Sequence, residues 1–293
     1  MRRAAAIVLV AASACGPPDH FPHELVSFVD HPANPVFTGG PAGDWDTEMR
    51  ERGFILRDEH GYRLWYTASC CGVRPLRLGH ARSKDGISWV RDPEPLVDDL
   101  WIEDVMVVRH DGEYIMVAEG AGHRSHWLTS PDGLAWTAHG RIEIRLRGGA
   151  PIPSAPYGTP TLFRAHGLWY LFYEILDDGI WLATSTDLGT FTNVSDLPVL
   201  PVGPGEHDAI QVALNQVIEH EGVYYAYYNG LGRRPEWTIN IARSTDLVHW
   251  RKYDGNPVLP AALRRTSGHV VRDGRGYRLY TTAGRVDVHL PAP

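Results

Sequence analysis

The stretch that decides the fold reads Phe54-Ile-Leu-Arg-Asp-Glu-His-Gly61-Tyr-Arg-Leu-Trp65-Tyr66. Two apolar, aromatic-rich runs flank a turn at Gly61, which is the pattern of a β-hairpin. The pattern recurs along the 293 residues, with its glycines at nearly even spacing: Gly61, Gly112, Gly167, Gly222 and Gly276. A repeat of about 50 residues built on a hairpin is typical of a propeller blade. The sequence therefore predicts an all-β fold, a five-bladed β-propeller.

A second landmark follows the hairpin in the first four repeats. It reads Ser-x-Asp, then Gly or Leu, then two variable residues and an aromatic residue, and it spans Ser83–Trp89, Ser130–Trp136, Ser185–Phe191 and Ser244–Trp250. An Asp in such a turn bonds its own backbone, so we interpret these acids as structural. The aromatic residue is expected to start the outer strand and to pack against the neighbouring blade.

The repeats place the blades at residues 50–97, 100–146, 157–200, 208–259 and 266–290. The last blade lacks the Ser-x-Asp turn and an outer strand. The missing part occurs near the other end of the chain, where Asn34-Pro35-Val36 and the residues before it parallel Asn256-Pro257-Val258. We expect the N-terminal strand to complete blade five and close the ring, which removes the exposed edges of an open sheet array.

The N-terminus predicts a signal peptide over residues 1–15. A basic start, Met1-Arg2-Arg3, precedes an apolar segment that is too short to span a bilayer. The following Ala12-Ser13-Ala14-Cys15-Gly16 resembles the bacterial lipoprotein signal, in which the cysteine is lipidated. Ala12 replaces the usual Leu, so ordinary cleavage and secretion is the alternative. A tether over 16–23 would then lead to the propeller domain, 24–293, exported on the cell envelope, or else secreted or periplasmic.

The net charge and the small number of cysteines limit the classes of partner and metal site that the protein can have. The net charge of −7, with both signs interspersed, argues against a nucleic-acid backbone as a partner. We expect a monomer whose partner is a carbohydrate and whose membrane contact is through a lipid anchor only. Cys70 and Cys71 are too few for a zinc site and form either a vicinal disulfide or two reduced thiols in a turn. No cofactor is expected, and no EF-hand-like spacing supports a calcium ion in the channel.

The glycine turns also predict which residues face the central funnel. In a blade, the start of the first strand and the end of the second strand lie on the same face. At the first-strand starts stand Trp45, Asp46, Glu48, Arg50, Glu51, Arg52, Trp101, Glu103, Asp104, Tyr157, Gly158, Thr159, Glu206, His207, Asp208, Gln211, Asn215, Ser267 and His269. At the second-strand ends stand Cys70, Cys71, Glu119, Glu174, Asn229, Thr281 and Thr282. Acids mixed with Trp, His and amides suit a sugar, and glycoside hydrolysis needs two positioned carboxyl groups.

At this level the chain resembles the five-bladed propeller glycosidases. These comprise the arabinanase and β-xylosidase group, glycoside hydrolase family 43, and the invertase and levansucrase group. Phrases such as Trp169-Tyr-Leu-Phe-Tyr173 and Asn256-Pro-Val-Leu259 carry the resemblance over essentially the whole mature chain. In the arabinanase-like group a blade-one Asp acts as base, a blade-two Asp orients and tunes, and a blade-three Glu acts as acid. Trp101-Ile-Glu-Asp104-Val105 resembles the blade-two motif, which implies the orienting role for Asp104.

Two positions depart from the family pattern. In blade one the family's Asp falls on Arg52, with Glu51 next to it and Asp46 upstream. In blade three Gly158-Thr159-Pro160 stands where the family has Glu-Gly-Pro, so the usual acid is absent. Glu174 ends the second strand of the same blade and could reach the same space.

These observations predict an exported glycoside hydrolase. Asp46 or Glu51 would be base or nucleophile, Asp104 the orienting carboxylate and Glu174 the general acid. Trp45 and Trp101 would stack on the sugar, and an oxidised Cys70-Cys71 would add an apolar platform. The other expected substrate contacts are Arg52, Glu103, Thr159, His207, Asp208, Gln211, Asn215 and His269. The alternatives are a non-catalytic glycan-binding lipoprotein and a propeller-type glycoside phosphorylase.

Overall fold

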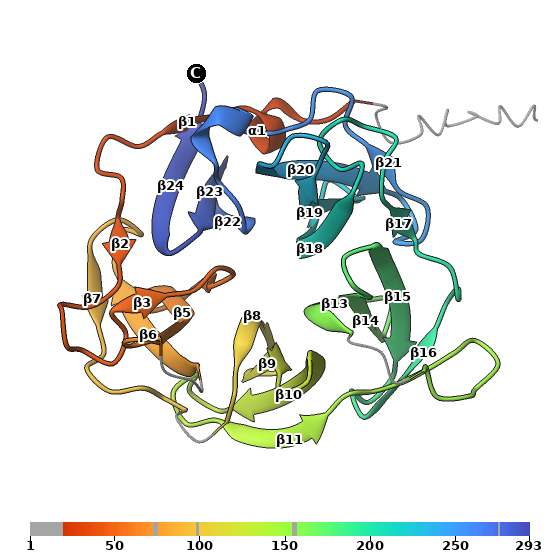
Figure 1. The fold of residues 1–293 in the computed structure, drawn as a ribbon, viewed down its shortest axis with the longest axis horizontal. Helices are drawn as coiled ribbons and strands as arrows, with labels where there is room; N and C mark the ends of the chain where they lie inside the picture. The colour runs from red at the N-terminus through yellow and green to blue at the C-terminus, as the bar shows by residue number, and fades with distance from the viewer. Residues whose placement is uncertain (1–19, 73–75, 98–99, 154–156, 275) are drawn as a thin grey trace, which may run out of the picture.

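Five small β-sheets surround a central axis in the computed structural model, and β8, β13, β18 and β22 lie nearest the axis in their sheets (Figure 1). The structure describes residues 20–72, 76–97, 100–153, 157–274 and 276–293. The predicted five-bladed β-propeller is confirmed. The predicted signal peptide with Cys15, and residues 16–19 of the tether, lie outside the described residues.

The first four blades follow one another along the chain, and successive strands within each blade pair antiparallel. Blade one contains β4 (Phe54–Asp58), β5 (Gly61–Ser69), β6 (Arg77–Ser83) and β7 (Trp89–Arg91), with β3 (Glu48–Met49) added beside β5. Blade two contains β8 (Glu103–His110), β9 (Glu113–Gly120), β10 (Arg124–Ser130) and β11 (Thr137–Arg141). Blade three contains β13 (Gly158–Ala165), β14 (Leu168–Glu174), β15 (Gly179–Ser185) and β16 (Thr190–Asn193). Blade four contains β18 (Gln211–His220), β19 (Val223–Leu231), β20 (Trp237–Ser244) and β21 (Arg251–Lys252).

Blade five joins the two ends of the chain. Its strands β22 (Gly268–Asp273), β23 (Gly276–Thr282) and β24 (Arg285–Pro291) are completed by β1 (Phe28–Asp30), which pairs antiparallel with β24. A short strand, β2 (Phe37–Thr38), also pairs with β24. The predicted closure by the N-terminal strand is therefore confirmed.

The two Asn-Pro segments that suggested this closure are equivalent in the structure. Asn34 exchanges two hydrogen bonds of 2.8 Å with the backbone of Val288, and Asn256 exchanges bonds of 2.9 and 3.0 Å with the backbone of Ile241. Both asparagines precede a cis proline. In each blade the asparagine side chain thus satisfies backbone groups of the third strand.

Two boundaries differ from expectation. The strand β12 (Glu143–Arg145) pairs in parallel with β16, and β17 (Leu200–Pro201) pairs with β15, so blade two ends at β11 and not at residue 146. At the N-terminus, Phe21 packs on Tyr253 before the helix α1 (His23–Val26) begins.

A 3₁₀ helix, Ala261–Leu263, precedes blade five. Among the described residues, none of these short helices has the length and apolarity needed to span a bilayer.

The Ser-x-Asp turns are structural, as predicted. Asp85 accepts hydrogen bonds from the backbone N–H of Ile87 and Ser88, at 2.8 and 2.7 Å, and these donors lower the pKa of its carboxyl. Trp136, which follows the equivalent turn in blade two, packs edge-on against Trp65 of blade one. The turns therefore stabilise the contacts between blades and do not line the axis.

Candidate active site

A pocket of about 480 Å³ lies where the first strands of the blades begin and the second strands end. All five blades or their connecting loops contribute to it. Its lining residues are Glu51, Arg52, Asp104, Glu119, His123, Thr159, Glu174, Asp177, Ala213, Asn229, Trp237, Thr266, Ser267 and Ala283. The acids come from blades one to three, whereas blades four and five contribute small side chains, an amide and Trp237. The predicted gathering of acids at one end of the axis is borne out by this arrangement.

An unusual backbone conformation aims several of these side chains. Arg52, Asp104, Thr159 and Ser267 have φ values between 50° and 59°, in the left-handed region that non-glycine residues rarely adopt. Each stands at or just before the start of a first strand, and β8 and β13 carry register shifts there. Bulges re-aim side chains, and strained backbone persists mainly at functional sites. The repetition of this device in four blades supports a functional role for the pocket.

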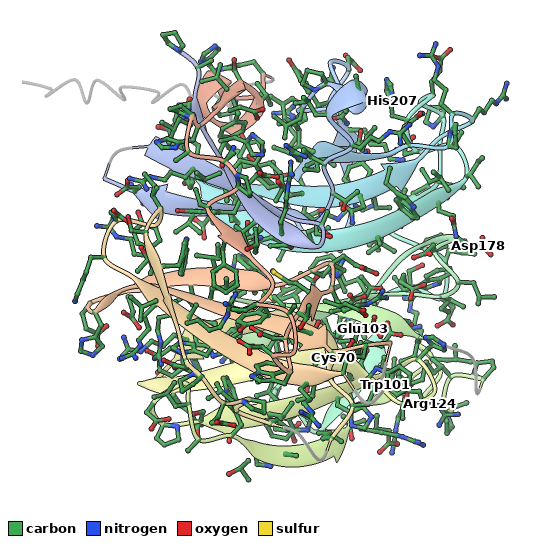
Figure 2. The ribbon with its side chains drawn as sticks, turned by 60° about the vertical axis from the view of Figure 1, so that its left-hand side comes forward. Cys70, Trp101, Glu103, Arg124, Asp178 and His207 are labelled. Carbon is green, nitrogen blue, oxygen red and sulfur yellow. A yellow bond between two sulfur atoms is a disulfide. The ribbon has the colours of Figure 1, made fainter. Side chains whose placement is uncertain are left out.

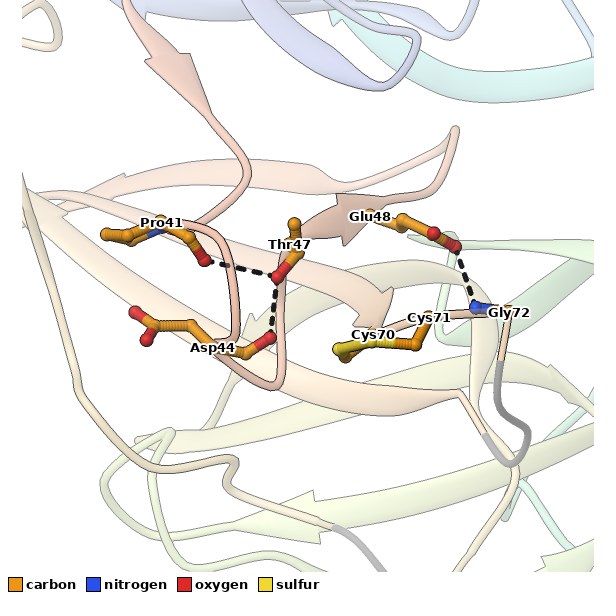
Figure 3. The surroundings of a disulfide bond; sticks show 7 residues. All are labelled: Pro41, Asp44, Thr47, Glu48, Cys70, Cys71 and Gly72. Carbon is orange, nitrogen blue, oxygen red and sulfur yellow. Dashed lines mark hydrogen bonds between the residues drawn. A yellow bond between two sulfur atoms is a disulfide. The ribbon is translucent and has the colours of Figure 1, made fainter.

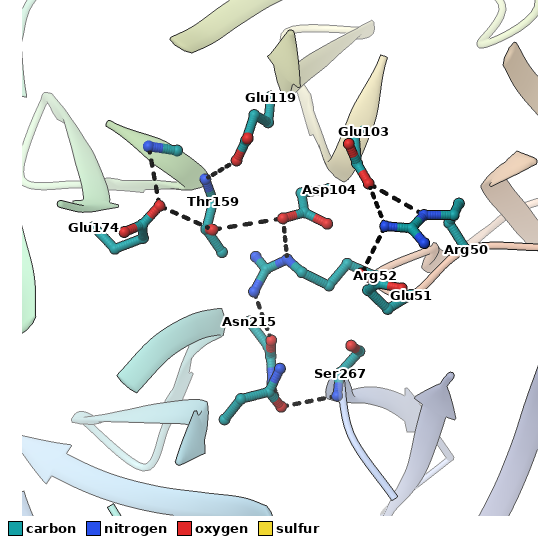
Figure 4. A network of polar contacts seen from close by, with 12 residues as sticks. Arg50, Glu51, Arg52, Glu103, Asp104, Glu119, Thr159, Glu174, Asn215 and Ser267 are labelled. Atoms are coloured by element: carbon teal, nitrogen blue, oxygen red, sulfur yellow. Dashed lines mark hydrogen bonds and ion pairs between the residues drawn. The ribbon is translucent and has the colours of Figure 1, made fainter. Parts of the chain in front are cut away.

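Arg52 crosses the axis and ties three blades together (Figure 4). Its guanidinium donates to Asn215 Oδ1 at 2.8 Å and to the carbonyl of Leu214 at 2.7 Å, and its Nε lies 3.6 Å from Asp104 Oδ2. Arg52 is only 7% exposed. The position at which the resemblance implies a basic carboxylate is therefore held by a buried cation that compensates Asp104.

Glu119 and Glu174 occupy the space that Gly158 leaves free. The backbone N–H of Gly158 donates to Glu174 Oε1 at 3.2 Å, and the N–H of Thr159 donates to Glu119 Oε2 at 3.1 Å. A Cβ atom at Gly158 would overlap the Glu119 carboxylate and lie 2.8 Å from Glu174 Oε1. The acid that the resemblance places at this position is thus replaced by two carboxyl groups from neighbouring strands.

Burial raises the pKa of three carboxyl groups in this pocket. Desolvation is the largest cause that raises the pKa of Glu174 to about 7, and the charges of Asp177 and Glu119 act in the same direction. Desolvation also raises the pKa of Asp104 well above its usual value, although the Arg52 charge opposes it. The pKa of Asp177 is raised, again chiefly by burial. A buried acid with a pKa near neutrality is what general acid catalysis requires.

Several predicted residues meet at this site. Glu51, Arg52, Asp104, Thr159 and Glu174 all line the pocket. Asn215 and Gln211 stand just behind it, since Asn215 binds Arg52 and Gln211 donates to Asp177 Oδ2 at 3.1 Å.

The rim beside Asp104 contains a second ion-pair cluster. Arg50 Nη2 lies 2.9 Å from Glu103 and 3.1 Å from Glu51, and the indole of Trp101 donates to Glu103 at 3.2 Å. Trp101 and Glu103 are not part of the pocket lining, and they lie on the same side of the molecule as Cys70 (Figure 2). We therefore place them at the rim and not in contact with the deepest part of the pocket.

The predicted position of Asp46 in the funnel is wrong. Asp46 is 1% exposed, and its Oδ2 accepts a hydrogen bond from Tyr66 at 2.6 Å and pairs with Arg91 at 2.7 Å. Trp45 stacks beside Tyr66, and its indole donates to the carbonyl of Pro93. Both residues fasten the loop before blade one to that blade's outer strand, so neither lines the pocket.

Asp208 repeats this arrangement in blade four. It is 3% exposed, accepts a hydrogen bond from Tyr228 at 2.9 Å and pairs with Lys252 at 2.6 Å. His207 precedes it, and its backbone carbonyl accepts a hydrogen bond of 3.4 Å from the Thr238 hydroxyl. Both residues lie in the loop that leads into blade four and outside the lining of the central pocket. The buried Asp208 is therefore corrected to a structural role, whereas the sugar contact of His207 stays a prediction.

His269 also has a structural position. Its Nε2 accepts the backbone N–H of Ile55 at 2.9 Å, and its ring stacks on Phe54. Burial lowers the pKa of this imidazole to about 3, so it stays neutral. It joins blades five and one behind the pocket, and the predicted sugar contact is corrected accordingly.

Cys70 and Cys71 form a vicinal disulfide at the end of β5 (Figure 3). Cys71 is exposed, and the neighbouring Gly72 donates its N–H to Glu48 at 3.3 Å. The disulfide is outside the pocket lining but on the funnel side of blade one. Of the two alternatives drawn from the sequence, the oxidised pair is the one found.

Four lining residues with a titratable or aromatic side chain had no role predicted from the sequence: Glu119, His123, Asp177 and Trp237. Glu119 was placed on the correct face as a strand end, but nothing linked it to Gly158. His123, Asp177 and Trp237 lie in or next to turns. Charged and aromatic residues are common in exposed turns, so their sequence positions did not indicate a pocket. The acidic turn that follows Glu174 was the signal available for Asp177. Within the described ranges, no three His, Cys, Asp or Glu side chains gather in a way that would hold a metal ion.

Solved structures share this fold over most of their length. A candidate glycoside hydrolase from Parabacteroides distasonis has a TM-score of 0.77 at 17% identity, covering 90% of this chain and 96% of that one. A structure from the GH130 family of mannoside phosphorylases, described as containing hydrolases that target β-1,2 mannosidic linkages in Candida mannan, has a TM-score of 0.73 at 17% identity, covering 95% and 98%. The β-1,2-mannobiose phosphorylase from Listeria innocua has a TM-score of 0.71 at 15% identity, covering 90% and 96%.

These likenesses show the fold. No family model matches the chain, and no curated protein matches it. The similar structures include the GH130 family, which differs from the arabinanase and invertase groups that the sequence resembles, so membership of either group is not established.

Proposed function

We propose that the chain is a glycoside hydrolase, exported and anchored through Cys15. The observation that carries the proposal is the convergence of Glu174, Glu119, Asp104 and Glu51 on one pocket. The fold shared with glycoside hydrolases and mannoside phosphorylases supports a glycosidic bond as the target.

In this proposal Glu174 protonates the leaving oxygen, because its buried carboxyl keeps its proton up to about neutral pH. Glu51 is exposed on the opposite, blade-one side of the pocket and activates the attacking water. Asp104, held by Arg52, orients the sugar. Trp237 is the aromatic ring in the lining and takes the stacking role predicted for Trp45 and Trp101.

The charge of the pocket favours water over phosphate as the attacking group. Among the described lining residues, five carboxyl groups stand against Arg52 and His123. Arg52 is already bound to Asn215, Leu214 and Asp104, and His123 Nδ1 lies 2.7 Å from Glu119. An inorganic phosphate would meet acidic side chains from three blades, and the one arginine of the described lining is already bound to protein groups.

An activity screen of the mature protein tests the proposal. The substrates are aryl glycosides, β-1,2-mannobiose, and plant, microbial and fructan polysaccharides, each with and without inorganic phosphate. We expect product without phosphate and no product from Glu174→Gln. Product that appears only with phosphate would establish a phosphorylase instead.

A non-catalytic glycan-binding protein is the second candidate, favoured by Arg52 and Gly158 at the two positions where the resemblance implies catalytic carboxylates. Isothermal titration that shows glycan binding, together with no cleavage across the same panel, would establish it. The anchor is tested separately by mass spectrometry of the mature N-terminus, with Cys15→Ala as the control.

A further inference from the structure

Gly158 lies beside the carboxyl groups of Glu119 and Glu174. Its φ lies outside the left-handed region, so the backbone conformation does not demand glycine. The limited space around Gly158 is what requires glycine, because a Cβ atom would overlap Glu119 Oε2 and approach Glu174 Oε1 to 2.8 Å. Both oxygens lie within 2.8 Å of that point, close enough for one carboxylate to act on the proton affinity of the other, an effect that extends over about 4–6 Å.

The two carboxyl groups have different partners. Glu119 has a hydrogen-bond partner on each oxygen, the N–H of Thr159 on Oε2 and the ring of His123 on Oε1. The His123 side chain is 69% exposed, and its Nδ1 lies 2.7 Å from Glu119 Oε1. Glu174 has no basic side chain among its described partners, which are the backbone N–H groups of Gly158 and Asp177 and the hydroxyl of Thr159.

The other charged groups near Glu174 do not change this difference. Asp177, in the turn after β14, adds a negative charge that raises the pKa of Glu174 in the same direction as Glu119 and more strongly, but it is not a basic partner. Asp104 of β8 is separated from Glu174 by the Thr159 hydroxyl, which lies 3.5 Å from Asp104 and 3.4 Å from Glu174. The Arg52 charge is directed to Asp104 and Asn215. Of the two carboxyl groups, Glu174 is therefore the one without a basic side chain among its described partners.

We propose that Glu119 and Glu174 form one coupled carboxyl pair, in which the Glu119 carboxylate adds to the effect of burial in favouring the protonated form of Glu174, and Gly158 provides the space for both. Glu119 is a positioning residue in this pair, since it acts through Glu174. The catalytic meaning of the pair rests on the proposed function, but the coupling itself does not require a substrate.

A titration followed by ¹³C NMR of glutamate carboxyl groups tests the coupling directly. The mature protein is compared with Glu119→Gln, and Glu174→Gln identifies the resonance. We expect the midpoint of the Glu174 titration to fall by about one pH unit or more in Glu119→Gln, as expected when a neighbouring negative charge is removed. An unchanged midpoint in a folded Glu119→Gln protein would overturn the proposal. Glu119→Asp, which keeps the charge, is expected to retain most of the elevation and guards against a merely structural effect.

Gly158→Ala tests the spatial part. The added methyl group should displace both carboxylates and lower the Glu174 midpoint. Gly148→Ala is the matched control, because a Cβ there meets nothing within 4 Å and its φ is ordinary. Equal midpoints in Gly158→Ala and Gly148→Ala would overturn the role of Gly158. These titration midpoints can be measured without any turnover, so they remain interpretable if the protein proves not to be a hydrolase. A midpoint that shifts as expected in a wild-type protein without activity would support the coupled pair and contradict the proposed function.

Discussion

Arg52 and Asp104 face each other across two blades, with Nε of the arginine 3.6 Å from Oδ2 of the aspartate. Burial is the largest cause that raises the pKa of the Asp104 carboxyl, and the charges of Glu119, Glu103 and Glu51 add to it. Arg52 is therefore the charge that allows this acidic cluster to exist in a buried place. Removing one partner of such a pair leaves the other charge uncompensated.

This relationship predicts unequal effects of two substitutions. Arg52→Gln should lower the free energy of unfolding by about 3–5 kcal/mol, because it leaves a buried acid unpaired. Asp104→Asn should cost less, since the amide is neutral and Asn215 and Leu214 still bind the guanidinium. Urea unfolding of both variants measures the difference. Equal losses would show that Arg52 does not compensate Asp104, and undiminished turnover by Asp104→Asn would remove the orienting role given to it.

The raised pKa of Glu174 predicts a dependence of stability on pH. The unfolded chain ionises this group near its ordinary value of 4.5, whereas the folded protein holds the proton to about 7. The unfolded state therefore binds fewer protons in this window, and the folded state loses stability as the pH rises from about 4.5 to 7. The shift corresponds to about 3 kcal/mol.

Glu174→Gln should abolish this contribution. The difference in the free energy of unfolding between wild type and variant is expected to change between pH 4.5 and 7 and to become constant above it. Denaturant unfolding at a series of pH values measures it. A difference that is constant throughout would contradict the raised pKa.

Asp46 and Asp208 should affect stability and leave catalysis unchanged. Each is buried and pairs with a cation of the outer strand, Arg91 or Lys252, and with a tyrosine hydroxyl. Asp46→Asn or Asp208→Asn should lower the free energy of unfolding by about 3–5 kcal/mol. KM and kcat of the folded fraction should equal those of the wild type. A loss of kcat in folded Asp46→Asn would restore the catalytic role first predicted for it.

The contrast between Asp46 and Glu119 shows what the sequence could and could not reveal. The hairpin glycines predicted the number of blades and the face of the funnel, and the repeated Asn-Pro-Val segment predicted the closure, because all three depend on local sequence repeats. The direction of a side chain at a first-strand start depends on the left-handed backbone conformation of Arg52, Asp104 and Thr159. The sequence pattern does not predict this conformation. Asp46 has the residue type of a base but turns outward to Arg91. Glu119 becomes significant only because Gly158 of the next blade leaves room for it.

The vicinal disulfide predicts a redox effect on substrate binding at the rim. Cys71 is exposed beside Glu48, and the pair stands on the funnel side of blade one. Reduction, or Cys70→Ser with Cys71→Ser, should raise KM while leaving the pH profile of kcat unchanged, because Glu174 and Glu119 lie in blades two and three. Steady-state kinetics with and without a thiol reductant measure this. An unchanged KM would remove the disulfide from the list of substrate contacts.

Trp237 replaces the two tryptophans that the sequence suggested as stacking platforms. It is half-buried and lines the pocket on the side where blades four and five contribute the small side chains of Ala213, Ser267 and Ala283. A sugar ring has room on that side and an apolar surface to rest on. Trp237→Ala should raise KM about tenfold, which corresponds to about 1.4 kcal/mol of binding free energy. Trp45→Ala is the matched control, because Trp45 stacks on Tyr66 away from the pocket, and it should lower stability without changing KM. A larger KM effect from Trp45→Ala than from Trp237→Ala would reverse this assignment and move the sugar toward blade one.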